Sequence, residues 1–231
     1  MLRLGHFERV VVFTGAGMSA ESGVPTYRGR GGIWNEYNYE DYACELAFQH
    51  DPDSVLDFHE LRRSHVLTCV PHAGHLHLAA LQRVHPSLNI ITQNIDGMHQ
   101  RVGTSVAAEL HGSLWRQRCA QHGRLTDTAG GRYRVRVCPR CGQTLRPDIT
   151  WFGDGIDQAV FATAQALIDE CDLFIAIGTA AIVWPAAGLI PFQRKPRPWL
   201  VEINPEETEV SDGFDDEIRQ PASKLSQLLK M

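Results

Sequence analysis

The sequence predicts an α/β protein with a doubly wound, Rossmann-like parallel sheet and one small zinc-binding insert. Short apolar segments rich in β-branched residues alternate with longer segments of helical periodicity. One stretch rich in Arg, Gly and Cys interrupts this alternation and lacks a periodic apolar pattern. Small or polar residues follow each apolar segment, as expected where an open α/β sheet places its ligand-binding loops.

Continuous apolar segments are expected to form buried parallel strands. They lie at residues 9–14, 89–92, 173–178 and 199–203. Segments with apolar residues on one helical face are expected to form the surrounding helices. They lie at residues 53–67, 72–84, 158–169 and 222–229. We therefore expect one domain over residues 1–231, with a Rossmann-like part formed by residues 1–114 and 148–231 and a small module at residues 115–147.

Composition and charge exclude several classes of protein. Apolar residues make up 43% of the chain and charged residues 21%, which is the balance of a globular domain with a sizeable core. The formal net charge of −5 gives no reason to expect binding to nucleic acid or to an anionic membrane. No apolar run approaches the roughly 18–20 residues of a membrane span. We expect a cytoplasmic monomer.

The first expected strand leads directly into the sequence GAGMSA at residues 15–20. A G-x-G-x-x-A pattern after a strand lets the backbone approach a pyrophosphate, and the following helix N-terminus supplies N–H groups. Alone, the pattern is also compatible with an ordinary glycine turn. Gly23 and Pro25 should end the helix within two turns, unlike the helix of an ordinary dinucleotide fold.

Polar residues also follow the second expected strand. Asn94 and Asp96 have side chains that can bond a carboxamide and ribose hydroxyls, although Asn-x-Asp-Gly is equally common in turns. His111 lies between a core leucine and a glycine, so it can project from a strand end into a cleft. A neutral imidazole there is suited to accept a proton near pH 7, although most histidines are structural or exposed.

Three of the six cysteines cluster with a histidine. Cys119 and His122 form a CxxH pair, and Cys138 and Cys141 form a CxxC pair, with fifteen residues between the two pairs. This spacing is typical of a structural zinc module, in which four protein ligands leave no open position for a substrate. The alternative is a degenerate site that no longer binds zinc, in which His122 is not a metal ligand. The other cysteines are expected to be buried thiols; they are Cys44, Cys69 and Cys171.

Three motifs, in this order, resemble those of the sirtuin family: GAGMSAESGVPTYRG at residues 15–29, TQNIDGMHQRVG at 92–103 and ELHGS at 109–113. The resemblance covers about residues 10–229. It implies that NAD is the cofactor and that the chain removes acyl groups from lysine side chains of other proteins. The products would be nicotinamide, O-acyl-ADP-ribose and free lysine.

The resemblance also implies roles for individual residues. His111 would be the general base that deprotonates a ribose hydroxyl, and Tyr27 would shield the reacting ribose. Ala180 replaces the serine that sirtuins have in a phosphate and ribose loop, and His122 replaces one of their four zinc cysteines. The residues expected to bind NAD are Gly15, Ala16, Gly17, Ser19, Ala20, Tyr27, Arg28, Gln93, Asn94, Asp96, Gly178, Thr179, Asn204 and Ala222.

Two further segments resemble the substrate-binding parts of sirtuins. Trp151, Phe152 and Gly153 resemble a segment that pairs with the substrate backbone as an added strand. Arg62 matches the arginine of a Tyr-x-x-Arg pair that binds acyl carboxylates in desuccinylases and demalonylases, and His59 replaces its tyrosine. These two residues share a helix face, so we expect them to act together on a carboxylate. His59 is expected to tune acyl choice or to make carboxylate binding depend on pH.

Ala43, at a position where that subgroup has a small residue, indicates a roomy acyl pocket. A solvated basic helix face is the alternative interpretation of Arg62. A protein-lysine deacylase that favours succinyl or malonyl over acetyl groups is the leading hypothesis. ADP-ribosyl transfer or NAD hydrolysis, and NAD sensing without turnover, are the alternatives. The intact ELHGS motif, Asn94 and the helix that carries Arg62 favour the deacylase.

Overall fold

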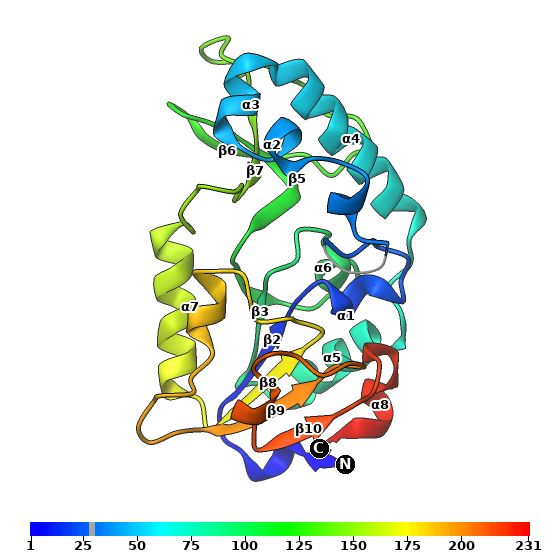
Figure 1. Ribbon diagram of the computed structural model, residues 1–231, viewed down its shortest axis with the longest axis vertical. Coiled ribbons are helices and arrows are strands. Elements are labelled where there is room, and N and C mark those ends of the chain that lie inside the picture. Colours follow the sequence, from blue (N-terminus) through cyan, green and yellow to red (C-terminus); the bar gives the residue numbers. More distant parts are fainter. Residues whose placement is uncertain (28–30) are drawn as a thin grey trace.

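The computed structural model describes residues 1–27 and 31–231, and its centre is a six-stranded parallel sheet (Figure 1). The strand order is β10–β9–β8–β2–β3–β4. The strands are β2 (Val10–Thr14), β3 (Leu88–Thr92), β4 (Val106–Glu109), β8 (Leu173–Ile177), β9 (Trp199–Ile203) and β10 (Asp216–Ile218). The four strands predicted from continuous apolar segments are confirmed.

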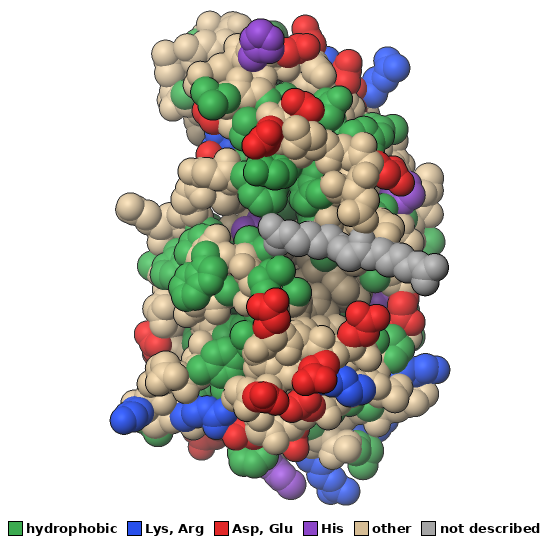
Figure 2. Space-filling view, in the orientation of Figure 1, with side chains coloured by type: hydrophobic (Ala, Val, Ile, Leu, Met, Phe, Trp, Pro, Cys, Tyr) green, Lys and Arg blue, Asp and Glu red, His purple; other side chains and the backbone are tan. Residues whose placement is uncertain are grey.

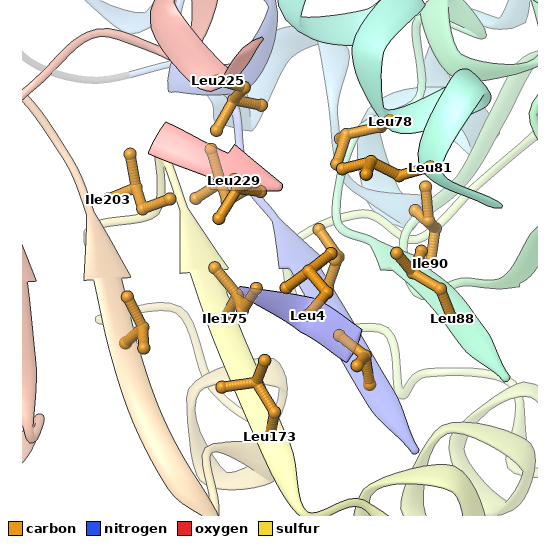
Figure 3. Packing of buried hydrophobic residues seen from close by; sticks show 14 of the residues in the cluster. Leu4, Leu78, Leu81, Leu88, Ile90, Leu173, Ile175, Ile203, Leu225 and Leu229 are labelled. Carbon is orange, nitrogen blue, oxygen red and sulfur yellow. The ribbon is translucent and has the colours of Figure 1, made fainter. Parts of the chain in front are cut away.

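Helices cover both faces of this sheet. Alternate residues of β8 point to opposite sides. Leu173 and Ile175 belong to a core with α5 (Ala73–Val84) and α8 (Leu225–Leu228), whereas Phe174 belongs to a core with α7 (Gln158–Glu170). Figure 3 shows the first core, in which side chains of α5 and α8 lie against β3, β8 and β9. The predicted doubly wound sheet is therefore confirmed.

The strand order reverses between β2 and β8. From β2 the chain continues to β3 and β4 on one side, and it later returns to form β8, β9 and β10 on the other side. In an open parallel sheet, ligands bind outside the carboxyl ends of the strands at such a reversal. The loops after β2 and β8 are therefore the expected ligand-binding loops.

A second, three-stranded antiparallel sheet lies above the first one in Figure 1. Its strands are β5 (Gly112–Cys119), β6 (Gly123–Thr126) and β7 (Arg146–Ile149). Helix α4 (Pro52–Thr68) packs against β5 and β7, and it also contacts α2 (Tyr39–Tyr42) and α3 (Glu45–His50). An apolar core between α4 and this sheet supports the module in addition to any metal. The limits of the insert at residues 115 and 147 stay a prediction.

The predicted helix over residues 222–229 is confirmed only for residues 225–228 and is wrong at both ends. The chain forms a 3-10 turn (Ala222–Lys224), the single turn of α8 and then strand β11 (Leu229–Lys230), which pairs with β1 (Leu2–Arg3). Backbone pairing with the N-terminal segment therefore competes with helix formation at the last residues. The helix that follows the glycine loop, α1 (Gly17–Ala20), ends within two turns as predicted.

The remaining elements are short. They are α6 (Met98–Arg101) and the 3-10 turns Leu4–His6, Ile33–Asn35, Ala186–Leu189 and Ser211–Gly213. Within residues 1–27 and 31–231, no helix combines the length and the apolar character needed to cross a membrane.

Candidate active site

A cleft of about 750 Å³ lies at the carboxyl ends of the strands of the large sheet and reaches the small module. In Figure 2, hydrophobic side chains gather in the middle of the molecule, between the regions of the two sheets. Residues that follow β2, β3, β4, β8 and β9 all contribute to its lining. The expected site residues that line it are Gly15, Ala16, Gly17, Ala20, Tyr27, Ala43, His59, Arg62, Gln93, Asn94, His111, Trp151, Phe152, Gly153, Gly178, Thr179, Asn204 and Ala222.

The floor of the cleft is formed where the loops after β2 and β8 meet. The Gly17 amide donates to the Gly178 carbonyl over 2.8 Å. A Cβ at Gly15 would come within 2.7 Å of the Gly178 oxygen, and Gly178 itself has φ +59. These glycines are therefore required by the contact between the two loops. Because the Gly17 N–H is used in that contact, it is not a free donor for a phosphate.

Amide side chains converge on Thr179. The Nε2 atom of Gln93 donates to the Thr179 hydroxyl over 2.9 Å, and the Nδ2 atom of Asn204 donates to the Thr179 carbonyl over 3.1 Å. Both hydrogen bonds use the side-chain NH₂ group as the donor, and they fix the orientation of the Gln93 and Asn204 amides. The amide oxygens have no hydrogen-bond partner within the described parts of the chain, so they are available as acceptors for ribose hydroxyls.

Two expected NAD residues, Ser19 and Asp96, do not line the cleft. Ser19 is buried and its hydroxyl accepts from the Nδ2 atom of Asn94 over 3.4 Å. Asp96 accepts from the Met98 amide over 2.8 Å, and burial raises the pKa of its carboxyl group. In this structure Ser19 supports Asn94 and Asp96 supports the turn before α6, and direct contacts with NAD stay a prediction. Arg28 lies outside the described residues.

His111 lies in the cleft between β4 and β5, at the junction of the two sheets. Its Nδ1 atom is 3.0 Å from the Gln93 carbonyl oxygen, which can only accept, so Nδ1 carries the proton. The Nε2 atom therefore has a free lone pair. Burial lowers the pKa of His111, and the bond to the Gln93 carbonyl partly opposes this. The imidazole is thus neutral at pH 7 and able to accept a proton at Nε2.

His59 is only 1% exposed and has both ring nitrogens engaged. Its Nδ1 atom lies 2.8 Å from the Val55 carbonyl, and its Nε2 atom accepts from the Trp151 indole over 3.4 Å. Burial lowers the pKa of His59 to about 3, with Arg62 adding to the effect. The expectation that its charge makes carboxylate binding depend on pH is wrong for the neutral range, because the ring stays uncharged there.

Arg62 extends along the aromatic wall of the cleft. Its guanidinium donates to the Tyr27 hydroxyl over 2.9 Å, and it lies 5.0 Å from the centroid of the Tyr27 ring. Arg62 has no ion pair with an acidic residue within residues 1–27 and 31–231. The interpretation as a solvated basic helix face is not supported, since Arg62 is partly buried and lines the cleft.

The segment around Trp151 links the acyl side of the cleft to His111. The Thr150 amide donates to the His111 carbonyl over 3.0 Å, and the Phe152 amide donates to the Ala43 carbonyl over 3.0 Å. Ala43 and Phe152 both line the cleft, and a roomy acyl pocket beside Ala43 stays a prediction. The backbone that resembles a substrate-pairing strand is therefore held by the general-base candidate on one side and by the Ala43 segment on the other.

The four zinc-ligand candidates come together. Their ligand atoms all lie within 4.8 Å of one another, with the sulfurs of Cys119 and Cys141 3.6 Å apart. The Nδ1 atom of His122 lies 3.6 Å from the Cys119 sulfur and 3.5 Å from the Cys138 sulfur. A regular tetrahedron with zinc bond lengths requires about 3.8 Å between sulfurs and about 3.6 Å between sulfur and nitrogen. The residues therefore fit a structural zinc ion with Cys₃His ligation.

The sequence analysis missed parts of the cleft. Trp34 lines it and packs on Tyr27, with 5.9 Å between ring centroids. The loop Ile182, Val183, Trp184 and Pro185 also lines the cleft. Two signals point to these residues. Aromatic residues recur between positions 34 and 42, and the loop follows the carboxyl end of β8.

Comparison with known proteins agrees with this geometry. The Sir2 family model matches residues 15–185. The chain is 38% identical over 217 residues to the NAD-dependent protein deacylase of Aquifex aeolicus (strain VF5), covering 93% of this chain and 90% of that protein. It is 40% identical over 223 residues to NAD-dependent protein deacylase 2 of Pyrobaculum aerophilum, covering 96% of this chain and 90% of that protein.

Solved structures give the same result. A complex of a Sir2 homologue mutant with ADP-ribose has a TM-score of 0.89 and 35% identity, covering 96% of this chain and 90% of that chain. A complex of a Sir2 homologue with NAD has a TM-score of 0.87 and 35% identity, covering 96% of this chain and 88% of that chain. Since the family model spans most of the chain and these relatives match over nearly its whole length, this chain belongs to the Sir2 family.

Proposed function

We propose that this chain is an NAD-dependent protein-lysine deacylase. The observation that carries the proposal is His111, whose Nδ1–H is fixed by the Gln93 carbonyl and whose Nε2 atom is free in the cleft. A general base must present an unprotonated nitrogen to the proton that it removes. The deacylase names of the Aquifex and Pyrobaculum relatives support this reaction.

The residues divide the work of this reaction along the cleft. NAD, when bound, supplies a ribose carbon from which nicotinamide leaves and a ribose hydroxyl that accepts the acyl group. The amides of Gln93, Asn94 and Asn204 bind and orient ribose hydroxyls and the carboxamide. His111 takes the proton of the ribose hydroxyl at Nε2. Trp151 and Phe152 form the wall along which the acyl-lysine side chain enters.

We further propose that acidic acyl groups, succinyl or malonyl, are preferred over acetyl. Arg62 supplies the support, since it is a partly buried cation that lines the cleft and has no acidic ion-pair partner in the described parts of the chain. A cation in such a place is stabilised by an anionic ligand, and guanidinium groups bind carboxylates with paired N–H donors. Ala43 leaves room for the longer acyl chain.

A peptide assay tests both parts of the proposal. One peptide is prepared with succinyl-, malonyl- or acetyl-lysine, and its NAD-dependent turnover is followed by mass spectrometry. We expect faster turnover of the acidic acyl groups and a loss of at least 100-fold in His111→Ala. Turnover of acetyl-lysine alone would retain the deacylase and reject the acyl preference. Consumption of NAD without a deacylated peptide would instead favour ADP-ribosyl transfer or NAD hydrolysis.

We propose acyl-lysine-bearing proteins as the partners, and a monomer in the cytoplasm as the working form. All six cysteines are unpaired, which suits a reducing compartment. Light scattering coupled to size-exclusion chromatography tests the oligomeric state, and a mass near 25.8 kDa is expected for the monomer.

A further inference from the structure

We propose that the carboxylate of an acidic acyl group is bound by Arg62 together with the hydroxyl of Tyr27, and that His59 does not bind it. This inference rests on the proposed acyl preference and identifies the second donor of that site. It assigns the second donor to Tyr27, a residue of the segment that follows the glycine loop, and not to His59 of the helix that carries Arg62.

His59 cannot serve as the second donor. Its Nδ1–H is used by the Val55 carbonyl, and its Nε2 atom faces the indole N–H of Trp151 as an acceptor. A neutral imidazole has one N–H, so no proton remains to donate to a carboxylate. An acceptor nitrogen placed against a carboxylate would be repulsive. His59 therefore connects α4 to Trp151 and shapes the wall of the cleft.

Most N–H groups of the Arg62 guanidinium make no hydrogen bond with the described residues. A guanidinium has five N–H donors, and the hydrogen bond from Nη2 to Tyr27 is the sole one that Arg62 makes among the described residues. The charge of Arg62 acts on the carboxyl group of Asp96, but the two form no ion pair among the described residues, and Asp96 accepts from the Met98 amide. The remaining N–H groups of Arg62 are therefore available to a ligand in the cleft.

Tyr27 supplies the missing hydroxyl at the right place. Its oxygen accepts from Arg62 over 2.9 Å, which leaves its own O–H free to donate. No other partner of this hydroxyl lies within residues 1–27 and 31–231. A carboxylate beside Arg62 can therefore accept from the guanidinium and from the Tyr27 O–H at once. Both donors line the same cleft, and the small Ala43 also lines it.

The test compares Tyr27→Phe with Tyr37→Phe. Tyr37 also packs on Phe58 of α4, with 5.1 Å between ring centroids, but it does not line the cleft, so it is a matched control for the loss of a hydroxyl. We expect Tyr27→Phe to lower the ratio of kcat/KM for succinyl- over acetyl-lysine peptide at least tenfold, because a charge-assisted hydrogen bond is lost. Tyr37→Phe should keep the wild-type ratio.

Calorimetric binding of the two peptides without NAD separates this inference from the proposed function. Weaker binding of the succinyl peptide to Tyr27→Phe than to Tyr37→Phe, with acetyl binding equal in both, supports the inference even if no turnover is found. An unchanged succinyl-to-acetyl ratio in Tyr27→Phe overturns it while leaving the deacylase intact. A wild-type protein that binds and turns over acetyl peptide alone also overturns it, since no carboxylate is then recognised.

Discussion

His59 and His111 both line the cleft and have the same tautomer, but they have different roles. His59 and His111 both direct Nδ1 at a backbone carbonyl, which fixes the proton on that nitrogen. The Nε2 atom of His59 is then occupied by the Trp151 indole, whereas that of His111 has no described partner and faces the cleft. The neighbour of Nε2 therefore decides which histidine is structural and which can remove a proton.

The pH dependence of catalysis follows from the state of His111. Burial lowers its pKa below the ordinary value of 6.5, and the base must be neutral to act. We expect kcat/KM for an acetyl-lysine peptide to fall on the acid side as His111 is protonated, with the midpoint of that fall below pH 6.5. A profile from pH 5 to 8 checks this, and the uncharged acetyl group keeps substrate titration out of it. An acid limb with its midpoint at 6.5 or above would contradict the assignment.

At the level of elements, the interior strands were predictable and the edges were not. β2, β3, β8 and β9 are buried on both faces, so they are continuous apolar runs. β4 and β10 are short edge strands, β4 with a single β-branched residue and β10 with a single apolar residue, so neither forms the long β-branched run that predicts a buried strand. For the site, the glycine loop and the ELHGS motif predicted residues that line the cleft. The hydrogen bonds between Trp151 and His59 and between Arg62 and Tyr27 could not be predicted, because these partners are distant in sequence.

The small antiparallel module depends on the identity of residue 122. We expect His122→Ala to lose zinc and to lower the melting temperature, because three ligands leave the tetrahedron incomplete. His122→Cys should keep zinc with four sulfur ligands. Zinc per chain, measured by mass spectrometry after dialysis against a chelator, checks both. Cys44→Ser, outside the cluster, is the control and should match the wild type. Equal zinc content in His122→Ala would show that His122 is not a ligand.

On the scale of the whole molecule, ion pairs join the two sheets around His111. Arg116 of β5 pairs with Glu109 at the end of β4 and with Asp148 of β7, whose carboxylate also accepts from Arg124 of β6. His111 lies between Glu109 and β5, so these contacts surround the backbone that carries the base. The cleft thus lies at the junction of a large sheet, whose loops we propose to bind NAD, and a small sheet, beside which we propose that the substrate binds.

The stability of the molecule should depend on pH because several histidines are buried without charge. Burial lowers the pKa of His59 to about 3, that of His75 to about 2 and that of His99 to about 4, against 6.5 for an exposed histidine. Above pH 6.5 these rings are neutral in both the folded and the unfolded protein, so they do not make the free energy of unfolding depend on pH. Between pH 6.5 and 4 the unfolded chain binds more protons, so the free energy of unfolding falls as the pH falls.

Each of these histidines contributes up to about 1.4 kcal/mol per pH unit in that window. Urea denaturation at pH 7.5, 6.5, 5.5 and 5.0 measures the slope, which we expect to be near zero above pH 6.5 and steep below it. His99→Gln removes one titrating ring and should reduce the slope, whereas substitution of the exposed His50 by Gln should leave it unchanged. If the free energy of unfolding at pH 5.5 equals that at pH 7.5, these histidines are protonated or hydrated in the folded protein and the cleft wall formed by His59 is more open than described.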